Sequence, residues 1–221
     1  MSSVQLLRRD PGRFVDFSYR VARPFVAAFS RLYWDYELRN GDLLPRRGAF
    51  ILAPNHLSLV DPVFASLAAH QNVRYLAVDE LFGRSRFFDS LTGFWGAIPM
   101  PRAGIPWTSL MTAARTLRAD RPVGVFPESR RVDFWGETPP SSGAAWLALL
   151  TGAPIFPLAL EGSEHVMSYR TPRFRRAGIR ATVCDPIDPL DFMDNEDPLT
   201  ATIEAWQASM IQVLGPLRSE R

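Results

Sequence analysis

Residues 50–62 read FILAPNHLSLVDP. The apolar run from Phe50 to Ala53 predicts a buried strand, and polar residues follow at the point where this strand ends. Two of them, His56 and Asp61, are separated by four residues. In open α/β sheets, ligands collect beyond the carboxyl ends of the strands. This stretch therefore predicts a strand of the sheet and the place of a site.

His56 and Asp61 can be interpreted in two ways. A neutral histidine accepts a hydroxyl proton near pH 7 if a partner fixes its tautomer and stabilises the imidazolium. If a helix begins near Ser58, the intervening turn brings the Asp61 carboxylate back onto the ring. The structural alternative is a histidine that caps a helix beside an unrelated aspartate, and the spacing alone favours this alternative.

The rest of the chain alternates short apolar runs with helical stretches, a pattern typical of a sheet flanked by helices. We expect an α/β domain over residues 38–221, with a mixed, largely parallel sheet. The predicted strands are 49–54, 73–78, 96–100, 122–126, 155–160 and 179–184. The predicted helices are 61–70, 80–92, 106–119, 141–151 and 198–214.

Residues 1–37 form a separate, amphipathic helical element in this interpretation. Its apolar residues recur at three- and four-residue steps and include Phe14, Phe17, Phe25 and Phe29. Pro24 predicts a kink or a second helix, and hence a two-helix element. The phenylalanines either pack on the protein's own core or anchor the chain at an anionic membrane surface, and the pattern leaves both open.

Composition narrows the classes of function. With 221 residues, 47% of them hydrophobic, the chain is long enough for one compact core. The net charge of +2 gives no whole-surface attraction to nucleic acid, so we expect no nucleic-acid partner. Cys184 is the one cysteine, which excludes an internal disulfide. The three histidines are too scattered to indicate zinc, and we expect neither a metal nor a cofactor.

Membrane-spanning segments are not predicted. No window approaches the roughly 20 apolar residues that a spanning helix needs, and the N-terminus lacks the pattern of a secretory signal. We therefore expect a protein that is cytoplasmic or attached to a membrane face.

Two further polar clusters follow predicted strands. Arg102 comes after the strand at 96–100, and Glu128 comes with Arg130 and Arg131 after the strand at 122–126. Guanidinium groups match the oxygens of a phosphate bidentately, so these arginines are candidate phosphate ligands. Each arginine alone would more often be a solvated surface charge.

Four segments in this order resemble the glycerolphosphate acyltransferase superfamily, in particular its 1-acylglycerol-3-phosphate acyltransferases. Residues 55–61 match NHxxxxD, and residues 96–102, GAIPMPR, match a strand that ends in arginine. Residues 126–131, FPESRR, resemble FPEGTR, and residues 152–157, GAPIFP, resemble the apolar segment that follows. The resemblance covers about residues 38 to 165.

The resemblance implies a mechanism and an environment. His56, oriented by Asp61, would deprotonate the hydroxyl of a lysolipid, which attacks the thioester of acyl-CoA or of an acyl carrier protein without a covalent acyl-enzyme. Arg102 and Arg131 would bind the acceptor phosphate, and Glu128 would order this pocket or contact the glycerol. The N-terminal helices would dip into one leaflet, on the cytoplasmic face of the membrane.

Three departures from the family pattern leave the acceptor open. Ser129 replaces a glycine of FPEGTR, Arg130 replaces its threonine, and Val78 stands where many relatives carry lysine. Arg130 could supply the cation that Val78 removes. The acceptor is then 1-acylglycerol-3-phosphate, another lysophospholipid or another lipid alcohol. A non-catalytic, membrane-associated lipid-binding protein is the alternative of a different class.

Overall fold

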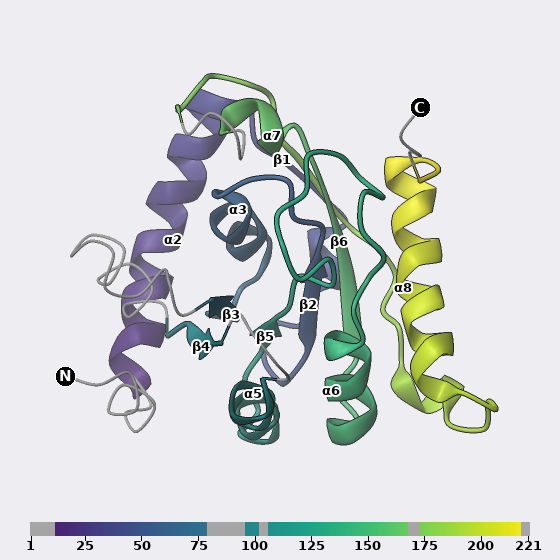
Figure 1. Cartoon of the computed structure of the whole chain (residues 1–221). Helices are drawn as coiled ribbons and strands as arrows, with labels where there is room; N and C mark the ends of the chain where they lie inside the picture. The colour runs from purple at the N-terminus through teal and green to yellow at the C-terminus, as the bar shows by residue number, and fades with distance from the viewer. Residues whose placement is uncertain (1–11, 79–95, 102–105, 168–172, 218–221) are drawn as a thin grey trace.

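The computed structural model describes residues 12–78, 96–101, 106–167 and 173–217, arranged as a sheet between two layers of helices (Figure 1). The strands in this part of the chain are β1 (Glu37–Arg39), β2 (Ile51–Pro54), β3 (Arg74–Val78), β4 (Ile98–Met100), β5 (Val123–Gly124), β6 (Ile155–Glu161) and β7 (Arg180–Val183). The α-helices of the described residues are α2 (Gly12–Trp34), α3 (Asp61–Ala68), α5 (Trp107–Arg118), α6 (Gly143–Thr151), α7 (Ser163–Val166) and α8 (Pro198–Leu214). The same residues form the 3₁₀-helices η1 (Gly41–Leu43) and η3 (Pro189–Phe192).

The sheet has the order β1-β7-β6-β2-β5-β3-β4. Its central strand β2 pairs in parallel with β5 on one side and β6 on the other, with Ile51 opposite both Val123 and Ile155. Among the described strands, β6 and β7 form the antiparallel pair, and β1 is parallel to β7 at the edge. The predicted α/β fold with a mixed, largely parallel sheet is confirmed.

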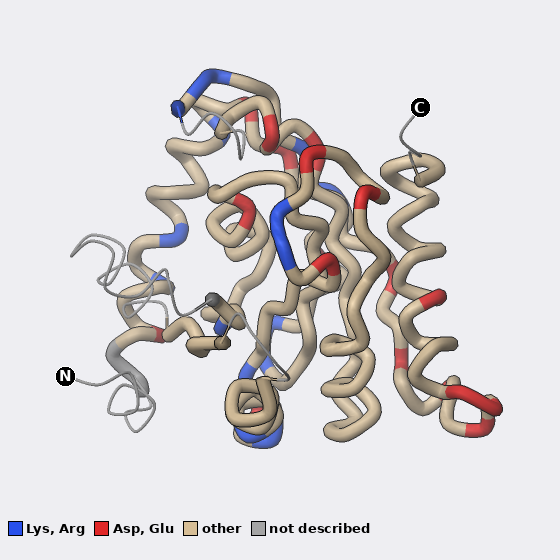
Figure 2. Tube along the Cα trace, in the orientation of Figure 1, with Lys and Arg blue, Asp and Glu red and all other residues tan. Residues whose placement is uncertain are grey.

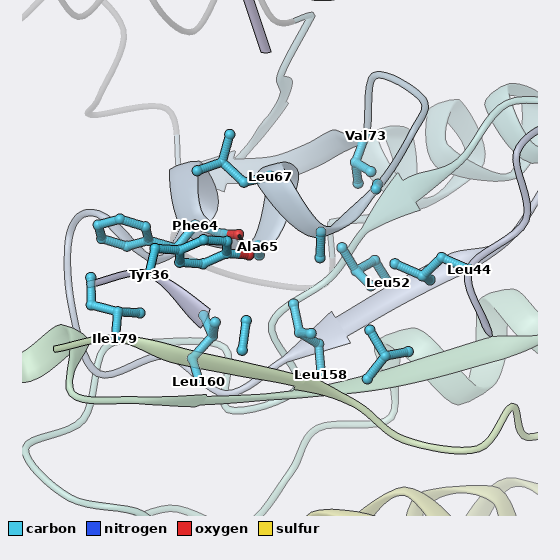
Figure 3. Close-up of a cluster of buried hydrophobic side chains, with 14 of the residues drawn as sticks. Tyr36, Leu44, Leu52, Phe64, Ala65, Leu67, Val73, Leu158, Leu160 and Ile179 are labelled. Carbon is cyan, nitrogen blue, oxygen red and sulfur yellow. Dashed lines mark hydrogen bonds between the residues drawn. The ribbon is translucent and has the colours of Figure 1, made fainter. Parts of the chain in front are cut away.

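Strand β2 is buried on both faces and supplies alternate side chains to two cores. Phe50 and Leu52 pack in the cluster that also holds Phe64 of α3, part of which is drawn in Figure 3. Ile51 and Ala53 face the opposite cluster, beneath α5, α6 and α8. Each large side chain buried in this way contributes about 1.5–3 kcal/mol. The strand that leads to the site is therefore held from both sides.

The helix after β2 begins where the sequence predicts. α3 starts at Asp61, with Pro62 in its first turn, where a missing N–H costs no hydrogen bond. Residues 55–60 thus form a short connection between a buried strand and a buried helix. Both ends of this connection are fixed, which limits the positions that His56 can take.

The described part of the N-terminal element is one continuous helix, so the predicted second helix does not begin at Pro24. Pro24 lies inside α2. Contacts on the turn before Pro24 join α2 to α3: the Tyr19 hydroxyl donates to the Ser66 carbonyl at 2.5 Å, and Arg23 donates to the Leu67 carbonyl at 2.9 Å. These bonds satisfy carbonyls at the end of α3 and dock α2 against it.

Candidate active site

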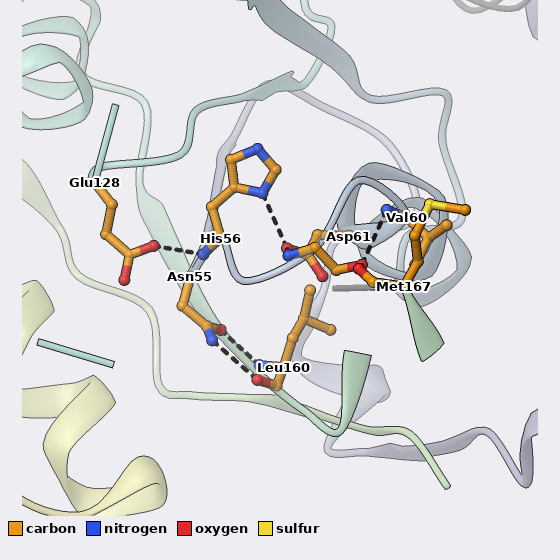
Figure 4. Close-up of polar contacts among 8 residues, drawn as sticks. Asn55, His56, Val60, Asp61, Glu128, Leu160 and Met167 are labelled. Atoms are coloured by element: carbon orange, nitrogen blue, oxygen red, sulfur yellow. Dashed lines mark hydrogen bonds and ion pairs between the residues drawn. The ribbon is translucent and has the colours of Figure 1, made fainter. Parts of the chain in front are cut away.

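His56 and Asp61 form a hydrogen-bonded pair (Figure 4). Asp61 Oδ2 lies 2.9 Å from His56 Nδ1, and the same oxygen accepts the backbone N–H of Ser58 at 2.6 Å. The Asp61 side chain is fully buried, whereas that of His56 is 16% exposed. A carboxylate at Nδ1 places the proton there, so Nε2 carries the lone pair. The ring is thereby set up to accept a proton at Nε2.

The loop that carries His56 is anchored to β6 and α7. The side-chain amide of Asn55 donates to the Leu160 carbonyl at 2.9 Å and accepts the Leu160 N–H at 2.7 Å. The Ser58 hydroxyl donates to the Met167 carbonyl at 2.6 Å. Buried polar groups paired in this way hold the backbone in one conformation.

Glu128 lies on the side of His56 opposite Asp61 (Figure 4). Its Oε2 accepts the backbone N–H of His56 at 2.5 Å, and its side chain is buried. Burial raises the pKa of Glu128 to about 8 against the lowering effect of the His56 hydrogen bond, and the charges of Asp61 and Glu137 add to the rise. Of the two roles considered for Glu128, these contacts support ordering of the site.

Two more contacts link the segment after β5 to His56. The backbone N–H of Val132 donates to the His56 carbonyl at 2.9 Å. The Phe126 ring stacks on the imidazole of His56, with centroids 4.0 Å apart and planes 23° from parallel. The Tyr75 ring stacks in turn on the Phe126 ring, with centroids 5.5 Å apart. The imidazole is therefore fixed in tilt as well as in position.

Two of the three predicted phosphate ligands, Arg130 and Arg131, lie within the described residues. Arg130 forms an ion pair with Glu137 at 3.3 Å, and its side chain is 61% exposed. Arg131 is half-buried in the same loop, and Arg102 lies outside the described residues. Ser129 takes a left-handed backbone conformation, with φ +58°, and its hydroxyl donates to Ser141 Oγ at 2.7 Å.

Three of the four predicted membrane-facing phenylalanines lie on the exposed side of α2. Phe17, Phe25 and Phe29 are 59%, 73% and 53% exposed, and the side chain of Phe14 lies outside the described part of the chain. The α2 residues that face the core include Val15, Tyr19 and Ala27. Among the described helices, none has the length and apolar character needed to cross a bilayer.

Comparison with known proteins places this site in a family. The model of a family described as Acyltransferase matches residues 35–161. The chain belongs to this acyltransferase family. The pair His56 and Asp61 and the Glu128 segment all fall within the matched range.

Individual matches to this member of the acyltransferase family support its fold. The chain is 25% identical to uncharacterized proteins of Mycobacterium tuberculosis and Mycobacterium bovis, over 79% of this chain and 50% of each relative. It therefore spans half the length of these relatives. The crystal structure of PlsC, a 1-acyl-sn-glycerophosphate (LPA) acyltransferase from Thermotoga maritima, superposes with a TM-score of 0.67 at 17% identity, over 97% of this chain and 96% of that one.

Several residues that shape the candidate site were not predicted to do so. Asn55 and Ser58 lie in the quoted motif. Their signal was a polar side chain next to the end of a predicted buried strand, which indicates a hydrogen-bonding role. Phe126 and Tyr75 gave no such signal, because an aromatic residue in a strand is usually a core residue. Phe126 stacks on His56 and Tyr75 stacks on Phe126, and both contacts join residues that are distant in sequence.

Proposed function

We propose that this acyltransferase moves a fatty acyl group from an acyl thioester to the free hydroxyl of a lysolipid. The foremost acceptor is 1-acylglycerol-3-phosphate, which would become phosphatidate. The donor is acyl-CoA or an acylated carrier protein. The observation that carries the proposal is the buried Asp61 carboxylate 2.9 Å from Nδ1 of the partly exposed His56.

The pair supplies both proton transfers of such a reaction. Nε2 of His56 takes the proton from the acceptor hydroxyl while its oxygen attacks the thioester carbonyl, and Asp61 stabilises the imidazolium. Collapse of the tetrahedral intermediate breaks the carbon–sulfur bond. The departing thiolate takes the proton from Nε2, which returns His56 to its neutral form. The site begins and ends in the same state, without an acyl-enzyme.

Acceptor recognition falls to the cations of the neighbouring segments. In this proposal Arg102 and Arg131 bind the acceptor phosphate, and Glu128 orders this pocket. Arg130 would bind the acceptor less tightly, because it already forms an ion pair with Glu137. The acceptor phosphate has to compete with the Glu137 carboxylate for this guanidinium group. With Val78 in place of a lysine, a lysophospholipid or another lipid alcohol is the second candidate acceptor.

The proposal includes peripheral attachment to a membrane. A lysolipid acceptor resides in a bilayer, and the exposed Phe17, Phe25 and Phe29 would lie at the boundary between headgroups and acyl chains. Attachment through one helix face brings the site to the lipid without a membrane-spanning segment.

His56→Ala tests the chemistry. We expect a loss of kcat on the order of 10²–10⁴-fold, measured as thiol release from acyl-CoA with lysophosphatidate in detergent micelles, with an unchanged circular dichroism spectrum. His165→Ala is the matched control, because His165 also lies beside a carboxylate, Glu164, at 3.6 Å, but is 74% exposed. Full activity of His56→Ala would overturn the mechanism.

An acceptor panel tests the substrate. Phosphate-bearing acceptors should be preferred, and Arg131→Ala should raise their KM more than that of phosphate-free alcohols. Rapid turnover of phosphate-free alcohols, unaffected by Arg102→Ala and Arg131→Ala, would contradict the phosphate assignment. Absence of thiol release with every donor and acceptor would favour a non-catalytic lipid-binding protein.

A further inference from the structure

Residues 173–176, Arg-Phe-Arg-Arg, run past the C-terminal end of α2, where Figure 1 draws them in light green. All four residues are exposed, and the Phe174 side chain is 62% exposed. Figure 2 shows positive charge at this corner of the molecule. None of these residues belongs to the family motifs, and the proposed chemistry does not use them.

The segment is joined to α2 through aromatic rings. Trp34 donates from Nε1 to the Arg175 carbonyl at 3.0 Å, and its ring lies 6.3 Å from that of Phe174. Trp34 also contacts Phe29 and Tyr33, at 5.3 Å and 5.1 Å between centroids. Exposed aromatic side chains from two distant parts of the chain therefore form one surface, which continues the exposed stripe of α2.

The aromatic surface rests on the core and is held in place. The Trp34 ring packs edge-on against Phe64 of the buried cluster, 5.5 Å between centroids. Phe29, Tyr33 and Phe174 all contact the Trp34 ring. These contacts hold the three side chains on the surface of the protein. Large exposed apolar surfaces that are held in this way mark interaction sites.

The charge of the segment indicates the partner. Arg173, Arg175 and Arg176 are exposed, and none of them has an ion-pair partner within the described residues. Basic side chains interleaved with aromatic ones match the surface of an anionic bilayer: the cations meet lipid phosphates and the rings enter the headgroup layer.

We propose that residues 173–176 and the aromatic end of α2, Phe29 and Tyr33, form a docking surface for a membrane that contains anionic phospholipid. This inference deepens the proposed function and rests on it for the lipid environment. α2 supplies the apolar contact along the membrane, and residues 173–176 supply the preference for negative charge.

The docking surface is connected to the candidate active site. The Arg175 N–H donates to the Val166 carbonyl at 2.8 Å, and the next residue, Met167, accepts the Ser58 hydroxyl at 2.6 Å. The docking segment and the loop that carries His56 are thus fixed to consecutive residues at the end of α7. A membrane bound at this surface would hold the site in one orientation toward the lipid.

The test variant is Arg173→Gln/Arg175→Gln/Arg176→Gln in the full chain. Its partitioning onto vesicles of phosphatidylcholine with phosphatidylglycerol, measured by co-sedimentation at low salt, should fall roughly 10–100-fold. Partitioning onto phosphatidylcholine alone should stay unchanged. Phe174→Ser should weaken binding to both kinds of vesicle, because it removes apolar contact rather than charge.

The matched control is Arg46→Gln/Arg47→Gln/Arg115→Gln, which removes three exposed arginines elsewhere and leaves the same net charge as the test variant. It should bind anionic vesicles as the wild type does. Equal binding by both triple variants, or failure of the wild type to prefer anionic vesicles, would overturn the proposal. The assay contains no donor or acceptor, so its result is independent of whether acyl transfer is found.

Discussion

The carboxyl group of Glu128 accepts a hydrogen bond from the backbone N–H of His56, although the two residues are 72 positions apart in the sequence. The neighbouring N–H of Val132 bonds to the carbonyl of the same histidine. The segment after β5 therefore fixes the backbone of the histidine loop on both sides of its side chain. Glu128 has the contacts of a positioning residue.

Glu128→Gln should alter the pH dependence of stability. Burial raises the pKa of Glu128 from 4.5 to about 8, so the folded protein holds this proton more tightly than the unfolded chain. The free energy of unfolding of the wild type should therefore fall as the pH rises from about 4.5 to about 8, by at most about 1.4 kcal/mol per pH unit. Glutamine keeps the acceptor oxygen and removes the titration, which should flatten this decline in urea unfolding. The exposed Glu196→Gln should follow the wild-type curve, and parallel curves for all three proteins would contradict the assignment.

Asp61→Asn should lower kcat with little change in KM. Asparagine can donate to Nδ1, which favours the tautomer protonated at Nε2, and that nitrogen then cannot accept the hydroxyl proton. We expect a loss on the order of 10²–10⁴-fold in thiol release. An amide nitrogen that donates to Nδ1 from this place also removes the acceptor of the Ser58 N–H, because one Asp61 oxygen makes both contacts. Glu164→Gln, beside the exposed His165, is the control. A rate within a few-fold of the wild type would remove Asp61 from the mechanism.

Gly124→Ala should reduce both stability and activity. A Cβ at this position in β5 would overlap the Tyr75 ring, which stacks on Phe126 and through it on His56. Overpacking of this kind costs about 1–3 kcal/mol, measured by thermal unfolding, and should shift the imidazole enough to lower kcat. At Gly143 a Cβ would meet open space, so Gly143→Ala should leave both quantities near wild type. Equal stability of the two variants would argue against the tight contact.

Ser129→Gly should be more stable than Ser129→Ala by about 1 kcal/mol. Both changes remove the hydroxyl that bonds Ser141, but glycine alone accepts a φ of +58° without a steric cost. Urea unfolding of the two variants isolates this backbone effect. An alanine variant as stable as the glycine variant would mean that the turn relaxes out of the left-handed region.

Phe25→Gln tests the exposed face of α2. The side chain is 73% exposed, so the free energy of unfolding should change by no more than about 0.5 kcal/mol. Vesicle partitioning should fall roughly tenfold, because one large apolar side chain no longer enters the interface. Leu190→Gln, at a 67% exposed position of η3, should leave partitioning unchanged. A large drop in unfolding temperature with unchanged binding would mean that Phe25 packs within the protein.

The elements that the sequence predicts well are those with a local hydrophobic signal. Residues 49–54 and 155–160 are continuous apolar runs, and both proved to be strands buried on two faces. The edge strand β1 was missed because Glu37-Leu38-Arg39 is short and mostly exposed, and its pairing with β7 is what defines it. The predicted helix at 80–92 lies outside the described residues.

The residues of the candidate site could be proposed from the sequence, but the orientation of the groups around them could not. The spacing of His56 and Asp61 left two interpretations open and alone favoured unrelated roles. Their pairing was the interpretation that required a helix to begin near Ser58, and α3 begins at Asp61. The orientation of Glu128 could not be read from the sequence, because an acidic residue beside two arginines suggests contact with substrate or solvent. The prediction at Pro24 failed for a related reason. The free-energy cost of a proline inside a helix can be inferred from the sequence, whereas the tertiary contacts of Tyr19 and Arg23 cannot.

The amide of Asn55 extends the contact between β2 and β6 beyond their last paired residues, Pro54 and Leu158. Its nitrogen and oxygen bond the carbonyl and the N–H of Leu160, so both backbone groups of this residue are satisfied after the chain has turned away. The sheet thus sets the point at which the chain is released toward His56. The Leu160 N–H is bonded to Asn55, so its exchange with deuterium should be slow while the histidine loop is bound to β6. Faster exchange at this one backbone position would report that the loop has detached from β6.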